Sequence, residues 1–232
     1  MHFPKALLLA AAATALTTGQ SSANSITKNA KPVVDIFYSA VSACGRRPHF
    51  RPTISLADFN TATRYDHATR TVFLVPYSAL DPSRRTAMDH FAAIGTLGLS
   101  GQQQYEEVFN NLLVAHELGH WVQEISGRPL NRWQAEFDAN RMMVAFWRDH
   151  PSKVNTELRL ANFIAQRPGS RPPLPADTSL SLEAYFNANI ASIEADPIQY
   201  SRFQKLMVMM AMAETPRPTF CETTRHGWMR IG

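Results

Sequence analysis

Hydrophobic residues recur at helical spacing over most of the chain. Apolar positions three and four residues apart lie on one face of a helix, where they can pack against a core. Runs of this kind predict helices over residues 31–43, 81–98, 101–126, 131–150, 152–167, 181–195 and 197–214. Helix start and stop signals support several boundaries of these predicted helices. Asp81 precedes a proline, Gly127 follows the third run and Pro151 follows the fourth.

Two short segments near the start of the chain have the composition of strands instead. Residues 51–56 (RPTISL) and 69–77 (TRTVFLVPY) are rich in β-branched and aromatic residues, and the polar stretch between them is typical of a turn. We expect these segments to form a small antiparallel sheet or hairpin ahead of the helices. The pattern as a whole predicts an α+β fold that is mostly helical.

The first 23 residues differ from the rest of the chain. Lys5 is followed by an apolar run over residues 6–16 and then by small polar residues. This pattern predicts a secretory signal peptide with Ala23 as the last residue removed, while a membrane anchor or a buried helix is the alternative. Residues 24–232 contain no repeat or low-complexity block, so we expect a single domain there.

Composition and charge narrow the possible functions. With 45% apolar and 18% charged residues, the chain has the balance of a folded protein. Lysine and arginine outnumber aspartate and glutamate by 23 to 19, but the arginines are scattered, so we expect no nucleic-acid partner. No later run approaches the ~18 apolar residues of a membrane span. We therefore expect an exported protein, periplasmic or extracellular, without stable membrane insertion.

The chain has two cysteines, Cys44 and Cys221. An exported protein usually meets an oxidising compartment, in which disulfides form and persist. We expect these cysteines to pair and to close a loop of 177 residues (221 minus 44). Such a loop corresponds to roughly 5 kcal/mol in the chain-entropy model. Two separate buried thiols are the alternative, because pairing depends on geometry that a sequence does not contain.

The predicted helix 101–126 contains the sequence His-Glu-Leu-Gly-His at residues 116–120. On a helix, His116 and His120 lie one turn apart on the same face, so both imidazoles can point at one ion. Glu117 lies beside them. Gly119 in the middle of a helix costs about 1 kcal/mol relative to alanine. Its presence indicates that another part of the chain approaches this turn closely.

A catalytic zinc site needs a third protein ligand besides two histidines. Glu136 lies sixteen residues after His120 on the next predicted helix, which the turn at residues 127–129 can fold back beside the first. Asn140 follows one turn later on the same face, whereas Asp138 faces the opposite side. The rivals of Glu136 as third ligand are Glu124 and either Glu106 or Glu107.

The residues from His116 to Asn140 resemble the signature of gluzincin-type zinc metallopeptidases, in which His-Glu-x-x-His precedes a helix with Glu-x-x-x-Asp. The resemblance implies a zincin-like pair of helices in which Zn²⁺ is bound by His116, His120 and Glu136. It makes Glu117 the general base and gives Asn140 the position of the aspartate that orients the first histidine. The chain is also similar to exported bacterial metallopeptidase families of unknown substrate.

Asn140 departs from that signature. Its side-chain oxygen can still accept a hydrogen bond from the histidine, but an amide raises the basicity of the ligand less than a carboxylate does. From the sequence alone, Asn140→Asp is therefore expected to leave zinc binding intact or to strengthen it.

The resemblance also implies a peptide or protein substrate that lies along an edge strand upstream of the motif helix. Residues 70–75 (RTVFLV) are the candidate for that strand, and a core strand is the alternative. The candidates for a donor that stabilises the oxyanion are His226, Tyr185 and Tyr200. The proline-rich stretch 168–179 is expected to form a loop or a lid.

The function expected from these features is that of an exported zinc metallopeptidase, in which Zn²⁺ activates water and Glu117 accepts its proton. Two other functions stay open. One is a non-catalytic protein of the cell envelope that binds zinc or peptides with the same fold. The other is a helical structural protein in which His116 and His120 are accidental. Metal content separates the last of these from the first two, and peptide cleavage separates the first two.

Overall fold

A computed structural model describes residues 26, 29–57, 63–93, 98–150 and 179–225. All structural statements below concern these residues. Several of the predicted features lie outside them: the signal peptide, the helix over residues 152–167, residues 168–178 of the proline-rich stretch, and His226.

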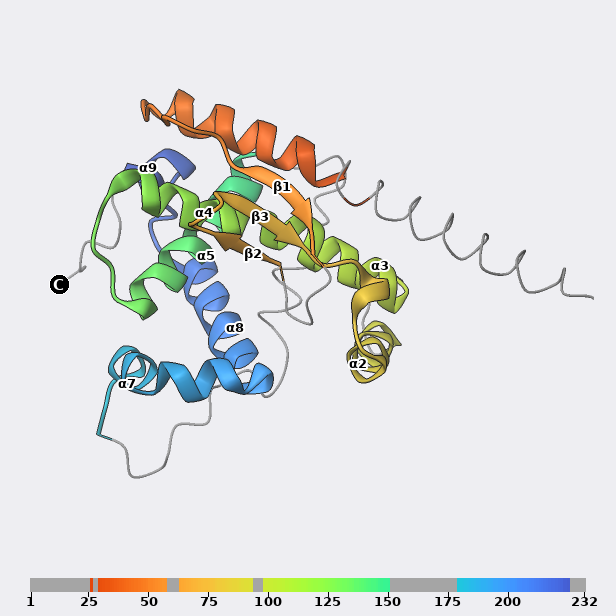
Figure 1. Ribbon diagram of the computed structural model, residues 1–232. Coiled ribbons are helices and arrows are strands. Elements are labelled where there is room, and N and C mark those ends of the chain that lie inside the picture. The colour runs from red at the N-terminus through yellow and green to blue at the C-terminus, as the bar shows by residue number, and fades with distance from the viewer. Residues whose placement is uncertain (1–25, 27–28, 58–62, 94–97, 151–178, 226–232) are drawn as a thin grey trace, which may run out of the picture.

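Helices dominate the described part of the chain, and a small sheet lies near its start (Figure 1). Residues 29–43 form the first helix, which we call the N-terminal helix. The next elements are β1 (Thr53–Leu56), β2 (Arg64–Asp66), β3 (Thr71–Leu74), η1 (Tyr77–Ala79), α2 (Pro82–Ala93), α3 (Gly101–Glu107) and η2 (Val108–Leu112). They are followed by α4 (Leu113–Ser126), α5 (Arg132–Asp149), α7 (Leu182–Ala195), α8 (Pro197–Ala213) and α9 (Phe220–Arg225). The predicted class, α+β and mostly helical, is confirmed.

The sheet is mixed, with the strand order β1-β3-β2. β1 runs parallel to β3, with Thr53 opposite Thr71, and β2 runs antiparallel to β3, with Tyr65 opposite Val72. The predicted antiparallel hairpin of residues 51–56 and 69–77 is therefore wrong. A parallel pair needs a longer connection than a hairpin turn. Here that connection contains β2, which lies within the polar stretch that suggested a turn.

The order of the strands also decides which one lies at the sheet edge. β3 has a partner on each side, so residues 70–75 form the core strand and not the edge strand proposed for the substrate. β1 and β2 are the two edge strands, and the backbone N–H of Tyr65 on β2 donates a hydrogen bond to Glu117 on α4. The sheet edge nearest the motif helix is thus formed by residues 64–66.

The described residues form two hydrophobic clusters, and both include residues of the helical run from α3 to α4. The main core joins the N-terminal helix to α4, α5 and α8, with Phe37 and Phe146 in ring contact at 4.8 Å between centroids. A smaller cluster of Val75, Leu80 and Tyr105 lies where β3 leads into η1 and α3. Between α3 and α4, the backbone forms the π-helical turn η2. The long helix predicted over residues 101–126 is therefore continuous but not uniform.

The helices α4 and α5 approach each other closely at Gly119. A Cβ atom added to Gly119 would lie 2.9 Å from the Cα atom of Ala139, a distance that Cβ atoms in proteins essentially never show. Only glycine fits this position without a shift of one helix. The close approach that Gly119 indicated in the sequence is thus present, and it brings α4 beside α5.

Gly119→Ala is expected to destabilise the fold although alanine is the better helix former. Overpacking of this kind costs about 1–3 kcal/mol, which exceeds the roughly 1 kcal/mol gained in helix propensity. Denaturant unfolding measures the difference. Gly127→Asn is the matched control, because Gly127 has φ 61° with no atom within 4 Å of an added Cβ, and asparagine tolerates that conformation. A Gly119→Ala variant as stable as the wild type would contradict the close contact.

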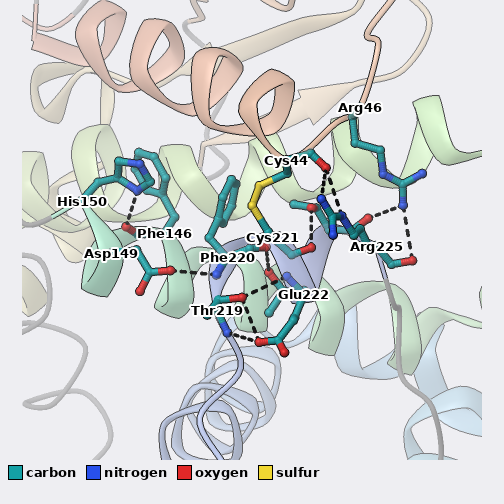
Figure 2. The surroundings of a disulfide bond; sticks show 12 residues. Cys44, Arg46, Phe146, Asp149, His150, Thr219, Phe220, Cys221, Glu222 and Arg225 are labelled. Carbon is teal, nitrogen blue, oxygen red and sulfur yellow. Dashed lines mark hydrogen bonds between the residues drawn. A yellow bond between two sulfur atoms is a disulfide. The ribbon is translucent and has the colours of Figure 1, made fainter.

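The predicted disulfide between Cys44 and Cys221 is confirmed, with 5.0 Å between the Cα atoms (Figure 2). It joins the end of the N-terminal helix to α9, a six-residue helix too short for its periodicity to be recognised in the sequence. Arg225 donates two hydrogen bonds to the carbonyl oxygen of Cys44, at 3.0 and 2.7 Å, and Arg46 donates to the carbonyl oxygen of Thr224.

Within the described ranges, no helix combines the length and apolar character needed to cross a membrane.

Candidate metal centre

The motif residues lie on two helices whose ends are fixed by local sequence. α4 ends at Gly127, which adopts the left-handed conformation that terminates many helices. α5 begins with a capping box, in which the side chains of Asn131 and Gln134 each accept a hydrogen bond from the other's backbone N–H. The short connection between these two signals folds α5 back along α4, so that Glu136 faces the histidines.

His116, His120 and Glu136 form a group whose ligand atoms all lie within 4.8 Å of one another. The two histidine Nε2 atoms are 3.2 Å apart, and Glu136 Oε2 lies 3.3 Å from Nε2 of His116 and 3.8 Å from Nε2 of His120. Ligands in a tetrahedral zinc site are about 3.4 Å apart, since each lies about 2.1 Å from the ion. His116 is 5% exposed and Glu136 2%. The spacing of this buried His-His-Glu group fits a metal ion.

The charges of the group are coupled. Burial lowers the pKa of His120 to about 4, so this imidazole is neutral at neutral pH. Burial acts to raise the pKa of Glu136, but His120, His116 and Arg132 outweigh it and hold that pKa well below its usual range. Burial lowers the pKa of His116, but the hydrogen bond and charge of Glu136 and the charge of Glu117 outweigh this effect. The pKa of His116 is therefore raised. The Glu136 carboxylate thus favours the charged form of His116, and a metal ion would compete with a proton for this imidazole.

Glu117 lies next to this group and is held by the sheet edge. Its Oε2 atom accepts a hydrogen bond from the backbone N–H of Tyr65 at 2.6 Å. Burial raises the pKa of Glu117 to about 7, against the opposing influence of the nearby His116 charge and the Tyr65 hydrogen bond. A carboxyl group with this pKa can both accept and release a proton near neutral pH.

Asn140 is buried one turn beyond Glu136, and its amide donates hydrogen bonds within α5 and to α8. Its Nδ2 atom donates to the backbone oxygen of Glu136 at 2.9 Å and to Oε1 of Gln204 at 2.8 Å. The Asn140 side chain also helps to raise the pKa of His116. The contact between the Asn140 side chain and His116 is weaker than a hydrogen bond, because Nδ1 of His116 is buried and has no hydrogen-bond partner among the described residues.

Gln204 is a member of the site that the sequence analysis missed. Its Nε2 atom donates a hydrogen bond to Oε2 of Glu136 at 2.7 Å, the same oxygen that faces both histidines. Gln204 comes from α8, 68 residues after Glu136, and nothing in the sequence around it distinguishes it from a surface glutamine. Its role follows only from the packing of α8 against α5.

The other acidic residues considered as ligands are engaged elsewhere. Glu124 accepts a hydrogen bond from the hydroxyl group of Tyr65 at 2.8 Å. Asp138 faces away from the group, as predicted, and pairs with Arg128 at 3.2 Å. Glu106 and Glu107 each accept a hydrogen bond from a neighbouring side-chain amide. None of these belongs to the group of His116, which contains Glu136 as its carboxylate.

Of the proposed oxyanion donors, Tyr200 is the one beside the metal-binding group. Burial raises the pKa of Tyr200 well above its usual value, with further contributions from the charges of Glu136 and Glu117 and from a hydrogen bond to Glu136. Tyr185 instead stacks against Phe203, with 6.4 Å between the ring centroids. The described residues thus favour Tyr200 over Tyr185.

Comparison of the chain with known protein families, with curated proteins and with solved structures gave no match. The nature of the site therefore follows from its own residues. These residues define a buried His-His-Glu group that could hold a metal ion, with the carboxyl group of Glu117 beside it.

Proposed function

We propose that this protein is a zinc-dependent metallopeptidase in which His116, His120 and Glu136 hold the metal. The supporting observation is the convergence of their three ligand atoms within 4.8 Å, next to the buried carboxyl group of Glu117. Two histidines and one glutamate form a ligand set found in catalytic zinc sites. Zinc bound by such a set acts as a Lewis acid and lowers the pKa of water, the chemistry that peptide hydrolysis requires.

Glu117 is the general base and acid of the proposed reaction. Its carboxylate accepts a proton from the attacking water and passes it to the leaving nitrogen of the peptide. The hydrogen bond from the Tyr65 backbone fixes the orientation of the carboxylate, and its pKa of about 7 matches both transfers. Tyr200 is the donor that we propose for the oxyanion of the substrate, because its hydroxyl group lies beside Glu136.

We propose that the enzyme acts on peptides or proteins outside the cytoplasm. The Cys44–Cys221 disulfide supports this location, because such bonds persist in oxidising compartments. The signal peptide predicted at residues 1–23 would provide the route of export.

Zinc content tests the metal site. Wild-type protein dialysed against buffer is expected to retain about one zinc per chain by mass spectrometry, as a three-ligand site holds one ion. Glu136→Ala is expected to lose most of it, since even outer residues change metal affinity by about 10–100-fold. Glu124→Ala is the matched control, which removes a rival carboxylate that is bonded to Tyr65, and should keep its zinc. Full zinc content in Glu136→Ala would refute the assignment of this ligand.

Cleavage of a mixed peptide library tests the catalytic part of the proposal. We expect the zinc-loaded wild type to hydrolyse peptides. A protein that binds zinc through these three residues but cleaves no peptide would instead be a non-catalytic zinc-binding or peptide-binding protein of the same fold.

A further inference from the structure

We infer that Gln204 and Asn140 act together as positioning residues that hold the Glu136 carboxylate toward the metal, and that this pairing requires an amide at position 140. The role presupposes the metal site proposed above. It concerns a hydrogen-bonded chain that starts at Asn140 on α5, passes through Gln204 on α8 and returns to Glu136 on α5.

The chain of hydrogen bonds is short and partly buried. Asn140 donates to Gln204 Oε1 at 2.8 Å, and Gln204 donates to Glu136 Oε2 at 2.7 Å. The same Glu136 oxygen lies 3.3 Å from His116 Nε2, so Gln204 is bonded to the oxygen that faces the proposed ion. A carboxylate oxygen has lone pairs for both contacts. Gln204 therefore fixes the direction in which Glu136 presents this oxygen.

The two amides can be oriented in one way only. A glutamate that binds a metal ion does so as a carboxylate, so Glu136 can only accept hydrogen bonds. Gln204 must therefore turn its NH₂ group toward Glu136 and its oxygen toward residue 140. Residue 140 must in turn be a donor, and the NH₂ group of Asn140 meets this need.

An aspartate at position 140 would break the pairing. Its carboxylate would face Oε1 of Gln204, and a rotated Gln204 would instead turn that oxygen toward Glu136. In the first arrangement the new carboxylate faces the Gln204 oxygen, and in the second the Gln204 oxygen faces the Glu136 carboxylate. Both place two acceptors together in a buried region, because Glu136 is 2% exposed and Asn140 1%. A buried acceptor without a donor is strongly unfavourable. The asparagine that replaces the aspartate of the Glu-x-x-x-Asp signature is thus paired with Gln204 on α8, which requires a donor at this position.

The position of Gln204 is itself well fixed by its helix. α8 is capped by Asp196, whose side chain accepts hydrogen bonds from two backbone N–H groups of the first turn. On either side of Gln204, the side chains of Phe203 and Met207 are fully buried in the main core. A side chain that extends from such a helix has little freedom to follow a displaced Glu136, which suits a residue that orients a ligand.

Zinc affinity measured by competition with a chelator tests this role in four proteins: the wild type, Asn140→Asp, Gln204→Ala and the double variant. Asn140→Asp and Gln204→Ala are each expected to weaken zinc binding by about 10–100-fold. In the Gln204→Ala background, the further change Asn140→Asp is expected to leave affinity unchanged or to increase it. The aspartate then faces no acceptor and can accept a hydrogen bond from His116.

Two controls separate positioning from folding. Gln199→Ala makes the same change five residues earlier on α8 and should bind zinc like the wild type, since its side chain is not part of the chain to Glu136. Thermal unfolding of the metal-free proteins shows which variants fold. The visible spectrum of the cobalt-substituted protein reports ligand geometry, and it should change in Asn140→Asp and Gln204→Ala but not in Gln199→Ala.

The outcomes are distinct. Wild-type protein that binds no zinc would overturn the proposed function together with this role. Wild-type protein that binds zinc, beside an Asn140→Asp variant that binds it equally well or better, would overturn the role of the amide pair alone. The same holds if Asn140→Asp weakens binding to the same extent with and without Gln204.

Discussion

Replacing Glu117 with glutamine is expected to abolish peptide cleavage while the protein still binds zinc. Glutamine has nearly the same shape as glutamate but cannot accept the proton of the attacking water. Loss of a general base lowers the rate by about 10²–10⁴-fold. The glutamine oxygen can still accept the hydrogen bond from the Tyr65 backbone, so the contact between α4 and β2 is retained. Cleavage rates and zinc content of the same preparations provide the measurement.

Glu124→Gln is the matched control for this substitution. It makes the same chemical change on the same helix, at a carboxylate that is bonded to the Tyr65 hydroxyl group. Its cleavage rate should equal that of the wild type. If Glu117→Gln cleaves peptides as fast as the wild type, the proton must be transferred by another residue.

Removal of the disulfide is expected to have the largest effect on stability. The Cys44→Ala/Cys221→Ala variant should lose about 2–5 kcal/mol of unfolding free energy, because the unfolded chain regains the freedom that the cross-link removes. The value should lie toward the upper end of that range, since the closed loop spans 177 residues. Denaturant unfolding with and without a reducing agent measures this difference.

The reducing agent also supplies the control. It should destabilise the wild type to the level of the double variant and leave the double variant unchanged. The native contacts around the bond persist in both, because Arg225 and Arg46 bind backbone oxygens and not sulfur atoms. Equal stability of the oxidised wild type and the double variant would mean that the cross-link contributes nothing.

The metal-binding group could be predicted from the sequence because its residues are close along the chain. His116 and His120 share one helix, and Glu136 lies on the next, so helix periodicity and one turn suffice to bring them together. The residues around them come from distant segments. Tyr65 precedes Glu117 by 52 residues, and Gln204 follows Asn140 by 64. Such contacts depend on tertiary packing, which leaves no pattern near either residue.

The sheet could be predicted only in part for a similar reason. The composition of β1 and β3 was sufficient to identify them as strands, but composition does not distinguish parallel from antiparallel pairing. The antiparallel partner of β3 is β2, which has three residues, of which only Tyr65 is buried. A strand this short gives no alternating pattern, and its pairing with β3 makes residues 64–66, and not residues 70–75, the sheet edge nearest α4.

The π-helical turn η2 accommodates one residue more than a regular α-turn would hold between α3 and α4. An α-helix turns about 100° per residue, so one extra residue in a uniform helix would rotate α3 by about that angle relative to α4. The π-turn absorbs this residue, so Tyr105 stays in the small cluster, where its hydroxyl group donates to the carbonyl oxygen of Val75 at 3.1 Å, while Leu118 packs in the main core. Loss of one residue from η2 is therefore expected to restore a regular α-turn and to leave both clusters in place, whereas loss of a residue from the α-helical part of α4 ahead of His116 would rotate α3 away from Val75.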